Sequence, residues 1–302
     1  MAATSAIRDH RPEPMTAASA GLALLASALW GGNLVALKVG MTAFAPFWSA
    51  WWRFLLGILG VAVWARSKGI VLHISRREFR PLMTLATLFA VQIGLLNVGT
   101  DYSSPAYGVV ILNSYPVFSN LIGHFVGSEQ RLNRARLLGL ALTLGGVCYL
   151  ASGKPVERLA PNPLLGNSLL LASSFLLGVR SVYTRRLVQS IEPVKAVVWQ
   201  MTLSMPFYLV PALLFEPFLT QRPAPGPVLA VLYQGLVVAC ICFVIWTALL
   251  RRHSSGNVTT FAFLVPLLGV VLSAVLLDEP ITARIVLATA MVTAGIAVVL
   301  RK

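Results

Sequence analysis

Four polar side chains stand in stretches of the sequence that are otherwise apolar. Asn33, Gln92 and Asn113 are amides, and Arg53 lies roughly 10 Å inside its stretch at 1.5 Å per helical residue. An unsatisfied polar group is costly in hydrocarbon, so we expect these side chains to face the interior of a helical bundle. Amides and a guanidinium can bind a small polar molecule there. The alternative for each amide is a hydrogen bond that only holds two helices together.

Arg53 is the charged residue that we expect to carry the chemistry of such a site. Its guanidinium can receive a substrate carboxylate or bind carbonyl groups at a helix end. A third interpretation is that the side chain reaches out to the membrane surface, as we expect for Arg180 near the end of its own stretch. Aromatic residues would supply walls, although single aromatic residues also face lipid. The predicted substrate-binding residues are Trp30, Asn33, Arg53, Gln92, Asn113 and Tyr115.

Two prolines, Pro116 and Pro266, stand near the middle of apolar stretches in the two halves of the chain. Each removes one backbone hydrogen bond and bends its helix. A pair of hinges is the functional interpretation, and a fixed kink needed for packing is the structural one. In both cases a freed carbonyl group becomes available to a substrate.

The sequence lacks the residue patterns of the common intramembrane enzymes. There is no His-Glu-x-x-His zinc motif, no pair of aspartates within apolar stretches and no serine with a convincing histidine partner. No P-loop occurs, so direct use of ATP is not expected. Cys240 and Cys242 point to different faces of one helix, which disfavours a metal site. We expect no metal, cofactor or catalytic residue, with an intramembrane enzyme as the competing class.

The composition indicates that membrane-spanning helices position these residues. Apolar residues make up 57% of the 302 positions and charged residues only 11%, against roughly 25% charged in an average soluble domain. A helix needs about 20 apolar residues to cross a bilayer. Stretches of suitable length occupy 16–39, 46–65, 81–100, 105–126, 134–152, 164–184, 194–215, 227–250, 256–277 and 282–300. The predicted fold is an all-α integral membrane protein with ten transmembrane helices.

Lysine and arginine residues are distributed unevenly between the two sides of these helices. With the N-terminus inside the cell, most of the 24 basic residues fall on the inner side, whereas the acidic residues divide evenly. This bias predicts that both termini are cytoplasmic. The net charge of +14 is then a consequence of topology. Binding of nucleic acid is not expected, because no folded basic face exists outside the membrane.

Several unusual residues recur in the second half of the chain at a nearly constant offset. At an offset of 150 the pairs are Ser104/Ser254, Pro116/Pro266, Glu129/Glu279, Arg134/Arg284 and Gly145/Gly295. At an offset of 147 they are Pro46/Pro193 and Trp52/Trp199, and at 146 they are Ser27/Ser173 and Gly32/Gly178. Each half holds five helices, so the second half enters the membrane from the opposite side. Two inverted five-helix repeats are the recurring plan of secondary transporters, whose halves rock about a site near the midplane.

These motifs resemble the drug/metabolite transporter superfamily, in particular its ten-helix members built from two EamA-type repeats. The resemblance covers nearly the whole chain. It rests on LASALWGGNLVALK in the first helix, on the segment from Pro46 to Arg53 and on the paired segments 116–147 and 266–298. Leu29–Trp30 and the turn Asn113–Pro116 are also similar to YddG-type exporters of aromatic and other neutral amino acids. The resemblance implies a bacterial inner-membrane transporter.

The expected organisation follows from the repeat and the resemblance together. Residues 1–15 would form a cytoplasmic N-terminal tail, 16–152 the first EamA-type repeat, 153–163 an external linker and 164–302 the second repeat. Ten helices can enclose a pathway within one chain, so a monomer suffices, and a homodimer is also compatible. The expected partners are a small-molecule substrate and the lipid bilayer.

The expected function is export of small neutral or zwitterionic metabolites, amino acids including aromatic ones, by alternating access. A nucleotide sugar or phosphate ester would require several basic residues, whereas only Arg53 and Arg180 lie within helices. Efflux of organic cations or drugs stays open, because aromatic residues can bind a cation. No carboxylate lies near the middle of a predicted helix, which disfavours proton antiport, with His124 as the titratable alternative.

Overall fold

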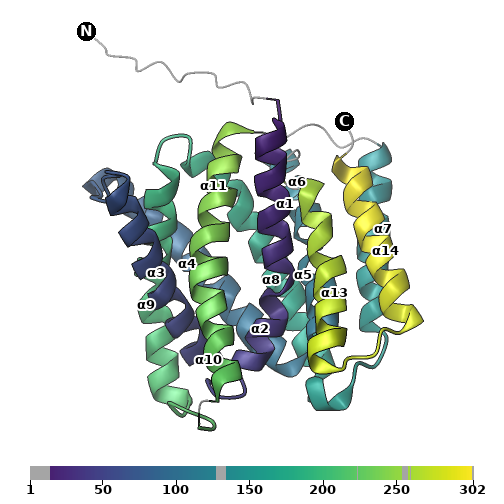
Figure 1. Cartoon of the computed structure of the whole chain (residues 1–302). Helices are drawn as coiled ribbons and strands as arrows, with labels where there is room; N and C mark the ends of the chain where they lie inside the picture. Colours follow the sequence, from purple (N-terminus) through teal and green to yellow (C-terminus); the bar gives the residue numbers. More distant parts are fainter. Residues whose placement is uncertain (1–13, 127–133, 223, 254–257, 259, 301–302) are drawn as a thin grey trace.

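Long helices stand side by side and make up all the regular secondary structure that is described (Figure 1). The computed structural model describes residues 14–126, 134–222, 224–253, 258 and 260–300. The first helix begins and the last helix ends at the same end of the bundle, which we call the termini end. The opposite end is called the far end. Residues 1–13 of the expected tail, and Glu129 and Ser254 of the repeat, lie outside the described residues.

Within the described residues, seven helical spans are long and apolar enough to cross a membrane: Ala17–Gly40, Pro46–Ser67, Arg76–Tyr102, Arg134–Ala151, Pro163–Leu187, Pro193–Phe215 and Pro225–Arg252. The other three predicted crossings consist of shorter helices. They are α5 (Pro105–Leu112) with α6 (Tyr115–Phe125), the 3-10 turn η3 (Thr260–Phe263) with α13 (Leu264–Leu277), and α14 (Ala283–Leu300). The chain is therefore an all-α membrane protein with ten crossings in two inverted repeats, as the sequence predicts.

Local sequence signals set the starts of the long helices. Proline, whose missing N–H is harmless in a first turn, begins α3 (Pro46–Ser67), α8 (Pro163–Leu187) and α9 (Pro193–Phe215). At the start of α4 (Arg76–Tyr102), Ser75 and Glu78 form a capping box. The Glu78 backbone N–H donates to Ser75 Oγ at 3.3 Å, and the Ser75 backbone N–H donates to Glu78 Oε2 at 2.8 Å.

Three of the predicted crossings are interrupted where the sequence suggested one continuous helix. The first is divided at Gly32 into α1 (Ala17–Gly31) and α2 (Asn33–Gly40). The fourth is divided at Asn113–Ser114 into α5 and α6, so a two-residue turn interrupts the helix just before Pro116, where a bend was expected.

The eighth crossing is the third interrupted one. It runs from α10 (Pro225–Leu232) through a π-helical segment, η2 (Tyr233–Cys242), to α11 (Phe243–Arg252). In the ninth, Pro266 lies in the first turn of α13, directly after η3. Both conspicuous prolines therefore begin a helix that follows an irregular segment.

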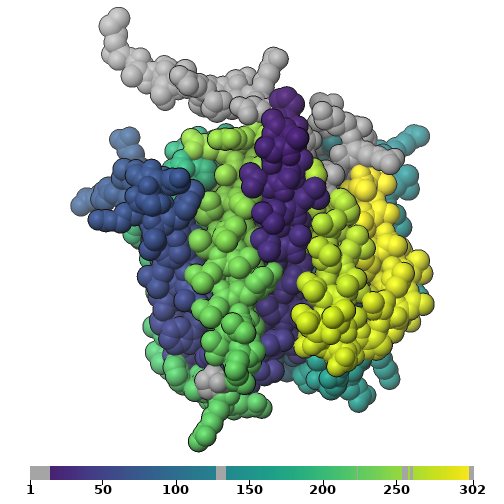
Figure 2. Space-filling model, in the orientation of Figure 1, coloured from purple at the N-terminus to yellow at the C-terminus, as the bar shows by residue number. Residues whose placement is uncertain are grey.

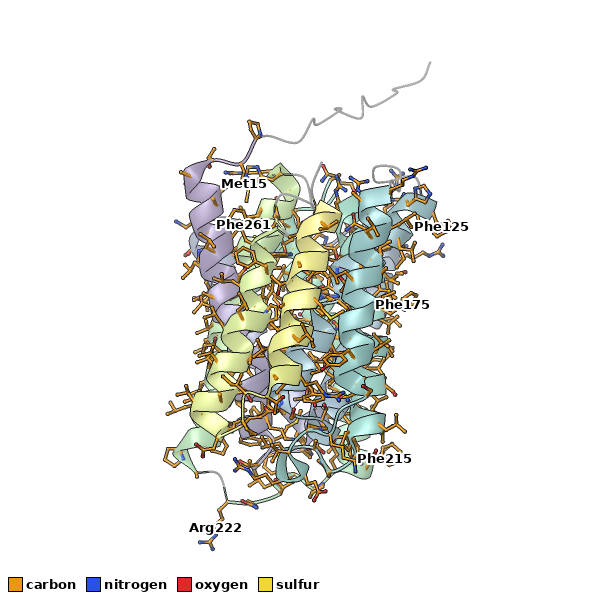
Figure 3. All side chains as sticks on the ribbon, turned by 90° about the vertical axis from the view of Figure 1, so that its right-hand side faces the viewer. Met15, Phe125, Phe175, Phe215, Arg222 and Phe261 are labelled. Atoms are coloured by element: carbon orange, nitrogen blue, oxygen red, sulfur yellow. The ribbon has the colours of Figure 1, made fainter. Side chains whose placement is uncertain are left out.

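Apolar side chains cover the outside of the bundle, where lipid would contact it. Phe175 points outward at mid-height and Phe215 near the far end (Figure 3), with 46% and 79% of their surfaces exposed. In the face shown by Figure 2, α1 packs between α11 and α13. Arg222 marks a loop at the far end, beyond the apolar surface.

Glycines allow α7 (Arg134–Ala151) and α14 to approach each other closely. A Cβ atom at Gly295 would lie 2.6 Å from the Gly139 carbonyl oxygen and 2.8 Å from the Thr143 backbone nitrogen. Small residues at such crossings let two backbones come close enough for dispersion forces to hold the helices together.

We therefore expect Gly295→Ala to destabilise the protein by about 1–3 kcal/mol, because the two helix backbones would have to move apart. Thermal melting in detergent, followed by the remaining monodisperse fraction, measures the effect. Gly21→Ala is the matched control, since no atom lies within 4 Å of a Cβ atom built there. Equal melting temperatures for the two variants would contradict this account of the α7–α14 contact.

Candidate functional site

The six predicted substrate-binding residues all line one cavity inside the bundle. It has a volume of about 140 Å³ and is also bordered by α8, α9, α11 and α13. Its lining reaches Thr184 and Leu250, which lie close to the ends of α8 and α11 at the termini end. The cavity therefore extends from the middle of the bundle toward the termini end. Pro116 and Pro266 do not line it.

Arg53 projects from α3 into the interior and is almost completely buried, with 2% of its surface exposed. Its guanidinium lies 5.0 Å from the centre of the Phe54 ring. Among the described residues, its Nε and Nη1 atoms have no hydrogen-bond partner. A buried guanidinium with unpaired donors is suited to bind an anionic group that enters the cavity.

Arg180 also lines the cavity, which contradicts the expectation that its side chain reaches the membrane surface. Its Nη1 atom donates a long hydrogen bond of 3.4 Å to Gln200 Oε1, and its guanidinium lies 4.9 Å from the centre of the Phe89 ring. Phe89 and Phe54 contact each other with ring centroids 4.8 Å apart. The two guanidinium groups therefore lie against a common pair of aromatic rings.

No described residue that lines the cavity is acidic. Tyr208, Cys242 and Arg180 are the titratable groups close enough to interact electrostatically with Arg53. Two positive charges are thus held in the cavity by cation–π contacts and hydrogen bonds alone, without a neutralising carboxylate in the described part of the chain. The missing negative charge is the main electrostatic property of the site.

Gln92 presents an acceptor to the same cavity, and its orientation is fixed by its neighbour. Ser173 Oγ donates to the Gln92 backbone carbonyl and accepts from Gln92 Nε2, both at 2.9 Å. The amide nitrogen must therefore face Ser173, which leaves Oε1 without a partner in the described structure. Asn33 Oδ1 is likewise buried and unpaired there. Both oxygens can accept a hydrogen bond from a cargo N–H.

Asn113 has a mainly structural contact at the break between α5 and α6. Its Nδ2 atom donates to the Val109 carbonyl oxygen at 2.7 Å, and its own backbone N–H reaches the same oxygen at 3.1 Å. The next residue, Ser114, donates from Oγ to the Ile111 carbonyl oxygen at 2.7 Å. Side chains thus satisfy carbonyl groups that the interrupted helix leaves free.

Aromatic side chains form the wall on the side of α1 and α11. Trp30 makes edge-to-face contacts with Trp246 at 4.9 Å and with Phe243 at 6.1 Å between ring centroids. Tyr115 from α6 also lines the cavity. The sequence predicts Trp30 and Tyr115 in this lining but not Trp246 and Phe243, because an aromatic residue in an apolar stretch carries no signal of the face it occupies. The polar Gln200 follows the same rule as Asn33 and Gln92 but is not among the predicted residues.

Positions related by the repeat meet in this cavity. The offsets of the sequence repeat pair Arg53 with Gln200 (147 positions), Leu34 with Arg180 (146 positions) and Tyr115 with Val265 (150 positions). All six of these residues line the cavity. The site therefore lies between the two halves, where inverted-repeat transporters place their substrates. The equivalent positions differ in chemistry, so each half contributes one arginine from a different helix.

Hydrogen bonds between the two halves close the far end. Glu216, at the end of α9, accepts from the backbone N–H groups of Phe47 at 2.9 Å and Trp48 at 3.1 Å in the first turn of α3. Glu279, after α13, accepts from the Ala106 N–H at 3.1 Å in the first turn of α5. A carboxylate at a helix N-terminus is favourable because it meets free N–H groups and the positive end of the helix dipole.

Lys38 adds a further contact at the far end within the first half. Its Nζ atom donates to the carbonyl oxygens of Thr100 at 3.1 Å, Asp101 at 2.6 Å and Ser103 at 3.3 Å. These carbonyls belong to the end of α4, where a cation is favourable. Together, Lys38, Glu216 and Glu279 hold the helix ends that separate the cavity from the far side.

The family to which the chain belongs is decided by a match to both of its halves. The model described as the EamA-like transporter family matches residues 18–152 and again residues 164–301. The chain belongs to the EamA-like transporter family. Membership makes it a multi-pass membrane transporter, in agreement with the inverted repeats and the central cavity.

The sequence is similar to several bacterial proteins over nearly its whole length. A Salmonella typhimurium protein described as a probable amino-acid metabolite efflux pump is 30% identical over 288 residues, which cover 91% of this chain and 92% of the relative. An Escherichia coli protein with the same description is 25% identical with the same coverage. The E. coli inner membrane transporter YedA, described as uncharacterized, is 25% identical over 279 residues and 88% of each chain.

A solved crystal structure shares the fold. It aligns with a TM-score of 0.70 over 93% of this chain and 98% of its own, at 21% sequence identity. This likeness concerns the arrangement of helices and not the cargo. Among the described residues no cluster of His, Cys, Asp or Glu is suited to hold a metal ion.

Loss of the Glu216 contact should open the far end. The reporter is a cysteine at the cavity position Leu34, labelled by a membrane-impermeant thiol reagent that is added on the far side. We expect Glu216→Ala to increase this labelling roughly fivefold, because the closed state loses the acceptor of two backbone N–H groups. The measurement uses a chain whose native cysteines are replaced. Glu157→Ala, an exposed acidic residue at the same end, is the control. Unchanged labelling would show that Glu216 does not keep this end closed.

Proposed function

We propose that this EamA-family chain exports small amino-acid metabolites, aromatic ones included, by alternating access. The observation that carries the proposal is the cavity between the two halves, in which Arg53 and Arg180 face aromatic and amide side chains. Two relatives with coverage above 90% are described as probable amino-acid metabolite efflux pumps, which supports the same class of cargo.

The cavity lining offers a partner to each chemical group of an amino-acid metabolite: the carboxylate, the apolar side chain and the N–H group. A carboxylate can pair with the unpaired guanidinium donors of Arg53, and an apolar or aromatic body can pack against Trp30 and Trp246. Amide oxygens of Asn33 and Gln92 can accept from an N–H group. A cavity of about 140 Å³ is smaller than the roughly 300–1,000 Å³ of sites for drug-sized ligands, which favours a small metabolite.

The structure corresponds to one state of the transport cycle in this proposal. The cavity extends toward the termini end, and the far end is held by Glu216, Glu279 and Lys38. With cytoplasmic termini, as the distribution of basic residues favours, this is an inward-facing state in the bacterial inner membrane. Export requires the far-end contacts to break while the halves close around the termini end.

One chain surrounds the whole cavity, so we propose that the monomer is sufficient for transport and that no nucleic acid or second protein takes part. Organic cations are the rival cargo. Two uncompensated guanidinium groups repel a cation, and the aromatic walls alone do not offset that repulsion. Amino-acid metabolites are therefore preferred to quaternary amines or cationic drugs.

Counterflow in proteoliposomes with a panel of amino acids, their acylated derivatives, sugars and organic cations tests this function. We expect exchange of carboxylate-bearing members and a loss of roughly tenfold or more in Arg53→Ala, because a charge-assisted pair with the cargo disappears. Arg66→Ala is the control, since this exposed arginine lies on the same helix outside the cavity. Exchange of sugars or cations in place of every carboxylate would overturn the proposal.

The amide next to the helix break gives a second, weaker test. Asn113→Ala should lower the exchange rate by a few-fold, because the Val109 carbonyl loses its side-chain donor at the edge of the cavity. Asn120→Ala is the matched control: Asn120 makes the same kind of contact, 2.8 Å from Nδ2 to the Pro116 carbonyl, one helix further on and outside the cavity lining. Equal effects of the two substitutions would assign Asn113 to helix stability alone.

A further inference from the structure

We infer that the cargo crosses as an organic anion, an amino acid whose amine is acylated and therefore uncharged, rather than as a zwitterion. The inference rests on the proposed function and specifies the charge of the molecule that enters the cavity between the two halves. Its basis is the pair of arginines that line the cavity, the buried Arg53 from the first half and the partly buried Arg180 from the second, with no carboxylate among the described lining residues.

The charge of the cavity discriminates against an ammonium group. A zwitterion brings one negative and one positive charge, so the net charge of the filled cavity stays at two. An anion lowers that net charge to one. At an effective dielectric constant near 20, each guanidinium about 10 Å from an ammonium group weakens its binding roughly tenfold. No described acidic side chain in the lining offsets this repulsion.

The amide oxygens of two other lining residues suit an uncharged N–H. Gln92 Oε1 is a single amide oxygen, fixed by the two hydrogen bonds to Ser173, and Asn33 Oδ1 is a second. An amide N–H donates one hydrogen bond, which one such oxygen satisfies. An ammonium group has three donors and a full charge, and buried ammonium groups require paired or multiple acceptors. An acylated amine therefore leaves fewer unsatisfied groups than a free one.

An anionic cargo also supplies the driving force for export. The membrane potential is negative inside, so it drives an anion outward, by about fifty-fold in concentration ratio per 100 mV for one charge. The cavity lining contains no Asp, Glu or His among the described residues, so it offers no obvious proton carrier. Potential-driven export of an anion needs no coupled proton.

Leucine and three derivatives, which form two size-matched pairs of acid and amide that differ in charge, test the inference in proteoliposomes. They are N-acetyl-leucine, an anion; leucine, a zwitterion; N-acetyl-leucinamide, which keeps the N–H but lacks the charge; and leucinamide, a cation. We expect N-acetyl-leucine to exchange roughly tenfold to a hundredfold faster than leucine, because one or both guanidinium groups repel the ammonium group. A potassium diffusion potential, negative inside the liposomes, should accelerate its efflux and leave leucine efflux unchanged.

Substitution of the arginines separates recognition of charge from loss of folding. Arg180→Gln should reduce the ratio of N-acetyl-leucine to leucine exchange toward one, whereas Arg66→Gln on an exposed face should leave the ratio unchanged. Arg53→Gln tests the more deeply buried partner, and Arg180→Gln remains informative if that variant does not fold.

The outcomes distinguish this inference from the proposed function. Exchange of leucine at a rate equal to or above that of N-acetyl-leucine, without an effect of potential, overturns the anion inference and leaves amino-acid export standing. An unchanged ratio in folded Arg180→Gln overturns it as well. Failure of every carboxylate in the panel, with folded protein in the liposomes, overturns both.

Discussion

The cost of placing polar groups in hydrocarbon is the constraint on which this structure depends. A charged side chain at the level of the membrane core must face protein or a cavity, because lipid offers it no partner. Arg53 and Arg180 meet this constraint by lying against the Phe54–Phe89 pair and facing inward. The same constraint acts on the amides of Asn33 and Gln92. It draws polar residues from separate helices to one place, and so creates the cavity.

Irregular backbone in the membrane follows the same rule. Non-helical carbonyl and N–H groups are tolerated only where protein or a cavity satisfies them. The break at Gly32 is covered by Tyr233, whose hydroxyl donates to the Leu29 carbonyl, and Tyr233 itself begins the π-helical segment of the eighth crossing. The break before Pro116 is satisfied by Asn113 and Ser114. Both breaks therefore lie beside the cavity, where a rocking motion between the halves would need compliant backbone.

The sequence predicts the ten crossings and their inverted repeat because hydrophobic length and residue pairs are properties of the chain alone. It also predicts six of the cavity residues, four of them (Asn33, Arg53, Gln92 and Asn113) because an amide or a charge among Leu and Val is visible without a structure. Gln200, an amide of the same kind, is not among them. Arg180 was misjudged, because distance from a helix end does not reveal which face an arginine occupies. Only its contacts with Gln200 and Phe89 place it inside. Trp246 and Phe243 were missed, since aromatic residues are common on lipid-facing and packed surfaces alike.

The two arginines occupy positions along their helices that the pseudosymmetry of the fold does not relate to each other. Arg53 lies roughly 10 Å from the far end of α3, and Arg180 lies roughly 10 Å from the termini end of α8, at 1.5 Å per residue. Their repeat equivalents are Gln200 and Leu34, so the charge is not duplicated by the pseudosymmetry of the fold. Their guanidinium groups nevertheless converge on the Phe54–Phe89 pair, so both charges border the same part of the cavity. The inverted repeat provides two similar ways to open the bundle, and the unequal side chains placed on it give the central cavity its two positive charges.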